Sequence, residues 1–191
     1  MKKIFLTVIA LLVISMSSVN AQAVWGLRVG LSTPQFTSRD GTSRISNFGW
    51  EVGLVLYYSL KNDFYINSGL MYSMKSLKIS MSTETMSYEA SYIEIPLYIG
   101  HSIPLGRVSS YAQLGPYIGF KLSEKESSML YSEDMDFINS YNAGLGIMYG
   151  INIKRFKIEV GYQYGFINFF NDKIENDVKL NTLFLGISYV F

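Results

Sequence analysis

Cysteine is absent from this 191-residue chain, histidine occurs once, and only 16% of the residues are charged. Without cysteine there is no thiol nucleophile, disulfide, iron–sulfur cluster or thiolate zinc site. A single histidine excludes a multi-histidine metal site built from one chain. The formal net charge of +1 gives no electrostatic reason to expect a nucleic-acid partner.

The sequence also lacks a run of apolar residues suited to a transmembrane helix. The apolar run Ile4–Ile14 has eleven residues, whereas a helix needs about 20 to cross a bilayer. It follows the basic start Met1–Lys3 and precedes a polar stretch that ends in Val19–Asn20–Ala21. This order is typical of a secretory signal peptide. We therefore predict that residues 1–21 are a cleaved signal peptide, with cleavage after Ala23 as the second choice.

The rest of the chain alternates apolar and polar residues with a period of two. Between Phe156 and Phe166, every even position is large and apolar or aromatic, and the odd positions hold Lys, Glu, Gly, Gln and Gly. Alternate side chains of a strand point to opposite faces, so this segment is predicted to be a two-faced strand. Seven more segments show the same pattern, and none has a convincing helical period. Their apolar sides begin at Trp25, Phe48, Phe64, Ile93, Leu114, Tyr141 and Leu183.

Glycine indicates which face of the strands points outward. Fourteen of the 16 glycines fall on the polar side, and only Gly41 and Gly106 lie in connections. A narrow barrel interior favours glycine because eight strands compete for one small volume. We therefore predict that residues 22–191 form an all-β fold, an eight-stranded antiparallel up-and-down transmembrane β-barrel, apolar outside with a Gly-rich polar lumen. The alternative is an exported soluble lipocalin-like barrel that binds a small hydrophobic ligand.

The connections between strands are predicted to alternate in length. This alternation is typical of outer-membrane barrels, which have short periplasmic turns and long outer loops. Eight strands then place both termini on the periplasmic side, and aromatic residues at the strand ends form two interfacial girdles. The short connections are Lys61–Asp63, Pro104–Arg107 and Lys154–Arg155, and the long ones are Thr37–Ser46, Ser80–Tyr88, Ser123–Met135 and Phe170–Asp177. The girdle residues are Trp25, Phe64, Phe156 and Phe191 at the periplasmic side and Phe48, Trp50, Tyr141 and Phe166 at the outer side.

The C-terminal residues resemble the assembly signal of bacterial outer-membrane barrels. Gly186, Tyr189 and the terminal Phe191 stand at the glycine and the two aromatic positions of that signal, whereas Phe184 stands where the pattern has a polar residue. The resemblance implies that the barrel-assembly machinery recognises this end of the chain.

Three further segments resemble the PorT-like outer-membrane β-barrel family, which is common in Bacteroidetes. They are Trp25–Ser32, Asn47–Leu54 and, most specifically, Ser91–Gly100 with the sequence SYIEIPLYIG. The resemblance spans the mature chain and implies this fold and an outer-membrane location. PorT itself is associated with type IX secretion, and the resemblance therefore implies secretion-system or surface proteins as possible partners. Outer-membrane lipid, including lipopolysaccharide, is the other expected partner.

Seven charged residues are predicted on the inward face of the barrel. An unpaired buried charge costs several kcal/mol, so we expect a hydrogen-bonded network that plugs the lumen. Eight-stranded barrels have filled interiors, which argues against a general pore and leaves a narrow gated channel as the minor alternative. The seven residues are Arg28, Glu51, Lys75, Glu94, Lys121, Lys157 and Glu159.

No enzymatic activity and no cofactor are expected. The single histidine, His101, has the outward parity of its strand and should face the lipid interface rather than act as a base. No serine stands in a G-x-S-x-G arrangement. The candidate Ca²⁺ or Mg²⁺ ligands are Glu133, Asp134 and Asp136, which would bridge to lipopolysaccharide phosphates, but the segment lacks a D-x-D-x-D-G pattern. We therefore predict a structural or interaction role, exerted through the outer loops or through secretion-machinery partners.

Overall fold

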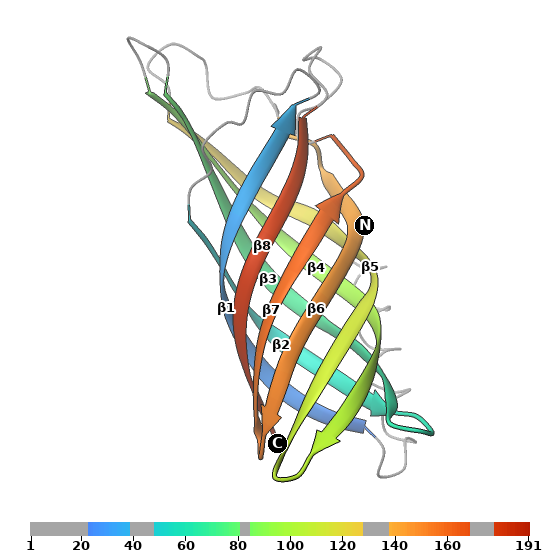
Figure 1. Ribbon diagram of the computed structural model, residues 1–191. Helices are drawn as coiled ribbons and strands as arrows, with labels where there is room; N and C mark the ends of the chain where they lie inside the picture. Colours follow the sequence, from blue (N-terminus) through green and yellow to red (C-terminus); the bar gives the residue numbers. More distant parts are fainter. Residues whose placement is uncertain (1–22, 39–47, 81–84, 128–137, 169–177) are drawn as a thin grey trace, which may run out of the picture.

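Eight β-strands make up the part of the chain that the computed structural model describes, residues 23–38, 48–80, 85–127, 138–168 and 178–191. Each strand pairs antiparallel with the next, and β8 pairs with β1, so the sheet closes into a barrel (Figure 1). The predicted eight-stranded antiparallel fold is confirmed. The strands are β1 (Ala23–Ser38), β2 (Gly49–Ser59), β3 (Phe64–Ser80), β4 (Thr85–Leu105), β5 (Val108–Ser127), β6 (Tyr141–Ile153), β7 (Phe156–Gly165) and β8 (Val178–Val190).

The seam between β1 and β8 is as continuous as the other strand pairs. Its register runs from Gly26 opposite Val190 to Ser38 opposite Val178. A closed sheet pairs the backbone groups of all its strands, which matters in hydrocarbon because each unpaired group there costs several kcal/mol. In the described ranges, the chain forms no helix that is long and apolar enough to cross a membrane.

The two faces of the sheet have opposite chemistry. Val29, Ile147 and Leu185 point outward with more than half of their surface exposed, while their chain neighbours Arg28 and Met148 are buried inside the barrel. The apolar side therefore faces outward, as predicted, and the soluble alternative with an apolar interior is wrong. Such a belt suits a hydrocarbon solvent, because a water-facing surface of this size would aggregate.

Exposed aromatic side chains lie near both ends of the belt. Phe156 packs edge-to-face on Tyr189, with ring centroids 5.2 Å apart, and Phe120 packs on Tyr141 at 5.8 Å. All eight predicted girdle residues have outward, exposed side chains. Aromatic rings of this kind are favoured at membrane–water interfaces.

The end of the barrel with the short connections, here called the short-turn end, also holds the last strand's C-terminus (Figure 1). The Phe191 amide donates a hydrogen bond of 2.9 Å to the Trp25 carbonyl, which ties the chain's last residue to β1. The β4–β5 turn is confined to Gly106 and Arg107, so it is shorter than the predicted Pro104–Arg107 connection. Gly106 has φ of +72°, a conformation that favours glycine.

At the opposite end, here called the long-connection end, the rim is uneven. Strands β3, β4 and β5 have 17, 21 and 20 residues, whereas β2 has 11 and β7 has 10. The predicted connections at this end were therefore too long. The first strand continues to Ser38, the β3–β4 hairpin is paired up to Ser80 and Thr85, and β5 continues to Ser127. Beyond the belt both faces of a strand are polar, so the apolar alternation stops although backbone pairing continues.

Candidate functional site: the barrel lumen

Arg28 is paired with two carboxylates inside the barrel. Its Nη2 lies 3.0 Å from Oε1 of Glu51 on β2, and its Nε lies 2.9 Å from Oε1 of Glu159 on β7. All three side chains are almost fully buried. Ion pairs of this length offset part of the cost of removing the three charges from water.

A second ion pair joins the neighbouring strands β3 and β4. Lys75 Nζ lies 2.5 Å from Glu94 Oε1, and Ser73 Oγ donates to the same oxygen at 3.1 Å. Lys75 and Glu94 are each only 2% exposed. We call Arg28, Glu51, Lys75, Glu94 and Glu159 the charged layer.

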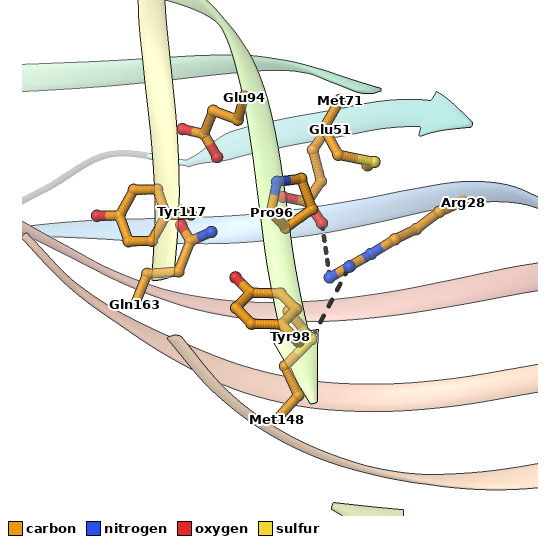
Figure 2. A pocket seen from close by; sticks show the side chains of 9 residues that line it. All are labelled: Arg28, Glu51, Met71, Glu94, Pro96, Tyr98, Tyr117, Met148 and Gln163. Carbon is orange, nitrogen blue, oxygen red and sulfur yellow. Dashed lines mark hydrogen bonds and ion pairs between the residues drawn. The ribbon is translucent and has the colours of Figure 1, made fainter. Parts of the chain in front are cut away.

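A small cavity lies within the charged layer. A cavity of about 10 Å³ lies between its side chains, lined by Arg28, Glu51 and Glu94 together with Tyr98, Tyr117 and Gln163 (Figure 2). A space of this size holds about one water molecule. Glu51 and Glu94 therefore sit in a packed polar interior, each beside its own cation, rather than in an open cleft suited to acid–base chemistry.

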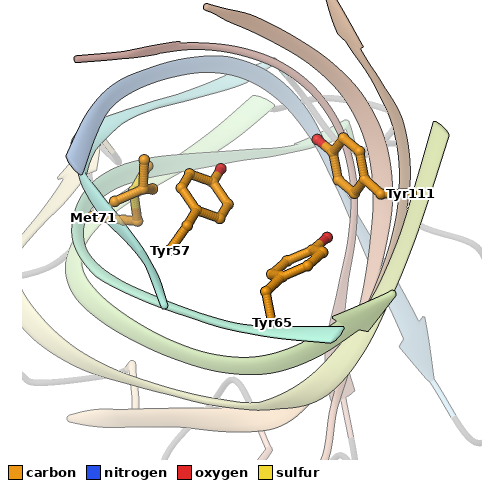
Figure 3. Close-up of a cluster of buried hydrophobic side chains, with 5 residues drawn as sticks. Tyr57, Tyr65, Met71 and Tyr111 are labelled. Carbon is orange, nitrogen blue, oxygen red and sulfur yellow. The ribbon is translucent and has the colours of Figure 1, made fainter. Parts of the chain in front are cut away.

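Lys157 is held differently from the other inward cations. Its Nζ lies 3.9 Å from the ring centroid of Tyr57, 4.4 Å from that of Tyr111 and 5.2 Å from that of Tyr65. Figure 3 shows these three tyrosines pointing into the barrel from β2, β5 and β3. We call Lys157 and the three tyrosines the tyrosine layer, which lies one inward position nearer to the short-turn end than Glu159.

A hydrogen bond joins the two layers. The Tyr111 hydroxyl donates to Glu159 Oε2 at 2.6 Å, while Oε1 of the same carboxylate pairs with Arg28. Glu159 thus connects strands β1, β5 and β7, which are not neighbours in the sheet. Contacts of this kind brace the barrel across its interior.

Lys121, the remaining predicted lumen residue, lies outside both layers. Its Nζ lies 2.6 Å from Glu124 Oε2 and donates to the Ile138 carbonyl, also at 2.6 Å. These partners stand toward the long-connection end of β5 and just before β6. The structure therefore brings six of the seven predicted residues into the two layers and places Lys121 toward the long-connection end.

Glycines provide the space that the large inward side chains occupy. A Cβ added at Gly146 would lie 2.5 Å from the Tyr98 hydroxyl, and one at Gly100 would clash with the Tyr65 ring. Across the barrel wall, Gly161 provides space for Phe184 in the same way. These three glycines provide space for bulky side chains, whereas at others, such as Gly69 and Gly115, an added Cβ would first meet the backbone of the neighbouring strand.

A family model described as "Outer membrane protein beta-barrel domain" matches residues 18–171. The chain belongs to this family. The protein is therefore an outer-membrane β-barrel, in agreement with its closed sheet and outward apolar belt. No curated protein matches the chain.

Solved structures of small outer-membrane proteins share this fold at low sequence identity. Ail, the attachment invasion locus protein of Yersinia pestis, in complex with the heparin analogue sucrose octasulfate, is 19% identical, with a TM-score of 0.51, 89% of this chain covered and 99% of Ail. OprG from Pseudomonas aeruginosa is 13% identical, with a TM-score of 0.54 and coverage of 88% and 96%. Neisserial surface protein A is 17% identical, with a TM-score of 0.51 and coverage of 87% and 97%. These likenesses show the fold of the barrel.

His101 and the predicted metal ligands are not among the predicted lumen residues. His101 faces outward and packs edge-to-face on Phe64, with ring centroids 4.6 Å apart, at the short-turn end. Glu133, Asp134 and Asp136 lie outside the described residues, as does the predicted signal peptide. Within the described ranges, no three histidine, aspartate or glutamate side chains gather in a way that could hold a metal ion.

Several lumen residues of this outer-membrane barrel were missed at the sequence level. They are large residues on the polar side of their strands, and strand parity alone would have found them because each shares the parity of a nearby inward glycine or charge. The missed residues include Tyr65, Met71, Tyr92, Tyr111, Met148 and Phe184, all buried.

Proposed function

We propose that this outer-membrane barrel is sealed and that it has a structural or interaction role, as neither a general pore nor an enzyme. The observation that carries the proposal is the charged layer, whose buried ion pairs lie in the lumen and whose Arg28, Glu51 and Glu94 line a cavity of only about 10 Å³. Eight strands enclose a space that side chains can fill, whereas water-filled porins need 16 to 18 strands.

The proposal is tested by solute flux through reconstituted protein. Purified barrel is inserted into liposomes loaded with a large impermeant sugar and then exposed to isotonic arabinose or sodium chloride. A sealed lumen gives no swelling above protein-free liposomes and no unitary conductance in a planar bilayer. Swelling or discrete conductance steps from the wild-type protein would overturn the sealed-lumen proposal and favour the gated channel.

We assign the interaction surface to the long-connection end, where β3, β4 and β5 continue beyond the aromatic residues of the belt. This orientation places the short-turn end in the periplasm. The likeness of Ser91–Gly100 to PorT-like proteins supports surface proteins or secretion-machinery components as partners, and the outward belt contacts membrane lipid, including lipopolysaccharide.

The orientation can be tested cleanly because the chain contains no cysteine. Single cysteines are introduced at Ser123, exposed near the end of β5, and at Asn62, exposed in the β2–β3 turn. A membrane-impermeant maleimide applied to intact cells should label the Ser123→Cys variant and spare the Asn62→Cys variant until the outer membrane is opened. The reverse pattern would invert the orientation.

The C-terminal residues Gly186, Tyr189 and Phe191 are proposed to act as the assembly signal. Phe191 is more than half exposed, and Tyr189 packs on its ring at a centroid distance of 5.7 Å. Deleting Phe191 should reduce the folded, heat-modifiable fraction in the outer membrane, while Phe156→Leu, a matched loss of an exposed aromatic at the same end, should not. Equal assembly of both variants would contradict this role.

A further inference from the structure

The Lys157 ammonium lies between the faces of three tyrosine rings that come from three different strands. All three centroid distances, 3.9, 4.4 and 5.2 Å, are within the range over which a ring attracts a cation. Lys157 stands on β7, whereas Tyr57 and Tyr65 stand on β2 and β3, so its side chain crosses the lumen. An aromatic enclosure on several sides is the arrangement by which proteins recognise organic cations.

No carboxylate in the described part of the chain forms an ion pair with Lys157, although Glu159 is two residues away. Both Glu159 oxygens are engaged elsewhere, one by Arg28 and one by the Tyr111 hydroxyl. The tyrosine faces therefore provide the direct contacts to this cation. The rings themselves are well fixed, since Tyr57, Tyr65 and Tyr111 are nearly or fully buried and pack edge-to-face on one another.

We propose that Tyr57, Tyr65 and Tyr111 form a binding site for an organic ammonium group, which the chain's own Lys157 occupies in this structure. Lys157 itself is partly exposed and stands near the start of β7, at the short-turn end. Alkylammonium groups fit because they combine one positive charge with an apolar stem, whereas Na⁺ prefers oxygen ligands. A sealed barrel does not require such a site, so this inference is independent of the proposed function.

The test is chemical rescue of a variant that lacks the resident cation. Lys157→Ala removes the side chain beyond Cβ, which corresponds to one propylammonium ion. Propylammonium chloride should raise the thermal unfolding midpoint of purified Lys157→Ala in detergent in a saturable manner. Equal concentrations of sodium chloride and of propan-1-ol, the neutral counterpart, should give no such saturable rise. Wild-type protein should respond only weakly because its site is filled.

Two substitutions at the nearest ring separate cation binding from general solvent effects. Lys157→Ala combined with Tyr57→Phe keeps the aromatic face and should keep the response to propylammonium. Lys157→Ala combined with Tyr57→Leu removes that face and should lose it. An equal response of the two double variants, or a propylammonium effect no larger than that of sodium chloride, would overturn the proposal.

A measurement on the wild-type chain decides the matter if Lys157→Ala does not fold. Lys154, exposed in the adjacent turn, is a matched reference for the reactivity of Lys157. The Lys157 amine should be acetylated several-fold more slowly than that of Lys154. The Tyr57→Leu substitution should reduce this difference in acetylation rate. Equal acetylation rates at the two lysines of the wild-type protein would show that the rings do not hold the ammonium, and would overturn the proposal.

Discussion

The charged layer and the tyrosine layer hold buried cations in two different ways. Arg28 and Lys75 are each within 3.0 Å of a carboxylate, whereas Lys157 is contacted by aromatic faces. Ion pairs match charge with charge but leave a buried ion of opposite sign when one partner is lost. Rings are neutral, so losing the cation from a tyrosine cage leaves no orphaned charge. Removing a cation should therefore cost more stability in the charged layer than in the tyrosine layer.

The largest expected effect comes from Arg28→Leu. This change leaves Glu51 and Glu159 buried without their cation, so the free energy of unfolding should fall by about 3–5 kcal/mol. Urea titration of liposome-embedded protein, followed by loss of the fast-migrating unboiled band, measures the change. Arg28→Lys retains a positive charge and should lose less. An unchanged midpoint for Arg28→Leu would mean that the two carboxylates do not depend on Arg28.

Glu94→Leu should have the next largest effect, because it leaves the Lys75 ammonium buried without its carboxylate. A loss of about 3 kcal/mol is expected in the same titration. The double variant Lys75→Met/Glu94→Leu removes both charges and should recover most of that loss. If the double variant loses as much as the two single variants combined, the pair is not coupled, and the explanation from an orphaned charge fails for this site.

Gly100→Val tests whether the glycines are needed as space for bulky neighbours in both layers. The added side chain would clash with the Tyr65 ring, so a loss of about 1–3 kcal/mol is expected. Ala112→Val, on the outward face of the neighbouring strand β5, is the matched control and should be nearly neutral. Adding Tyr65→Leu to Gly100→Val should restore part of the stability, and its failure to do so would place the strain elsewhere.

Lys157→Met should cause the smallest loss of stability. Comparing it with Arg28→Leu tests directly whether the two layers hold their cations in different ways. It keeps an unbranched apolar stem in the cage and removes only the cation–π attraction, so about 1–2 kcal/mol should be lost. Unfolding both variants in the same urea series gives the two losses in the free energy of unfolding, which can then be compared directly. A loss for Lys157→Met as large as that for Arg28→Leu would mean that Lys157 is held by charge pairing after all.

The fold could be predicted from the sequence because the alternation of apolar and polar residues, and the position of the glycines on the polar side, both follow from the two faces of the membrane belt. Glu51, Glu94 and Glu159 were placed on the inward face by that parity alone. Their partners could not be predicted, since Glu159 meets Arg28 and Tyr111 across the barrel, through a register and a strand tilt that no local pattern encodes. The cage around Lys157 could not be predicted for the same reason, because its three tyrosines come from β2, β3 and β5 and meet Lys157 of β7 only in the closed barrel.

The ends of the strands at the long-connection rim were also beyond the sequence pattern. Residues such as Ser123 and Lys125 are polar whichever face they occupy, so alternation carries no information there. Backbone pairing nevertheless continues, with Glu89 opposite Lys125 and Ser91 opposite Ser123. Hydrogen bonding between strands, which every residue type but proline can support, extends these strands past the belt.

Arg28 and Glu159 stand on β1 and β7, on opposite sides of the last strand, β8. Their ion pair requires β8 to be in place between them, and β8 pairs with β1 only when the barrel closes. A barrel that is open between β1 and β8 therefore lacks this pair. Interactions made after the rate-limiting barrier slow unfolding without speeding folding. We therefore expect Arg28→Leu to speed the unfolding of the closed barrel more than it slows folding.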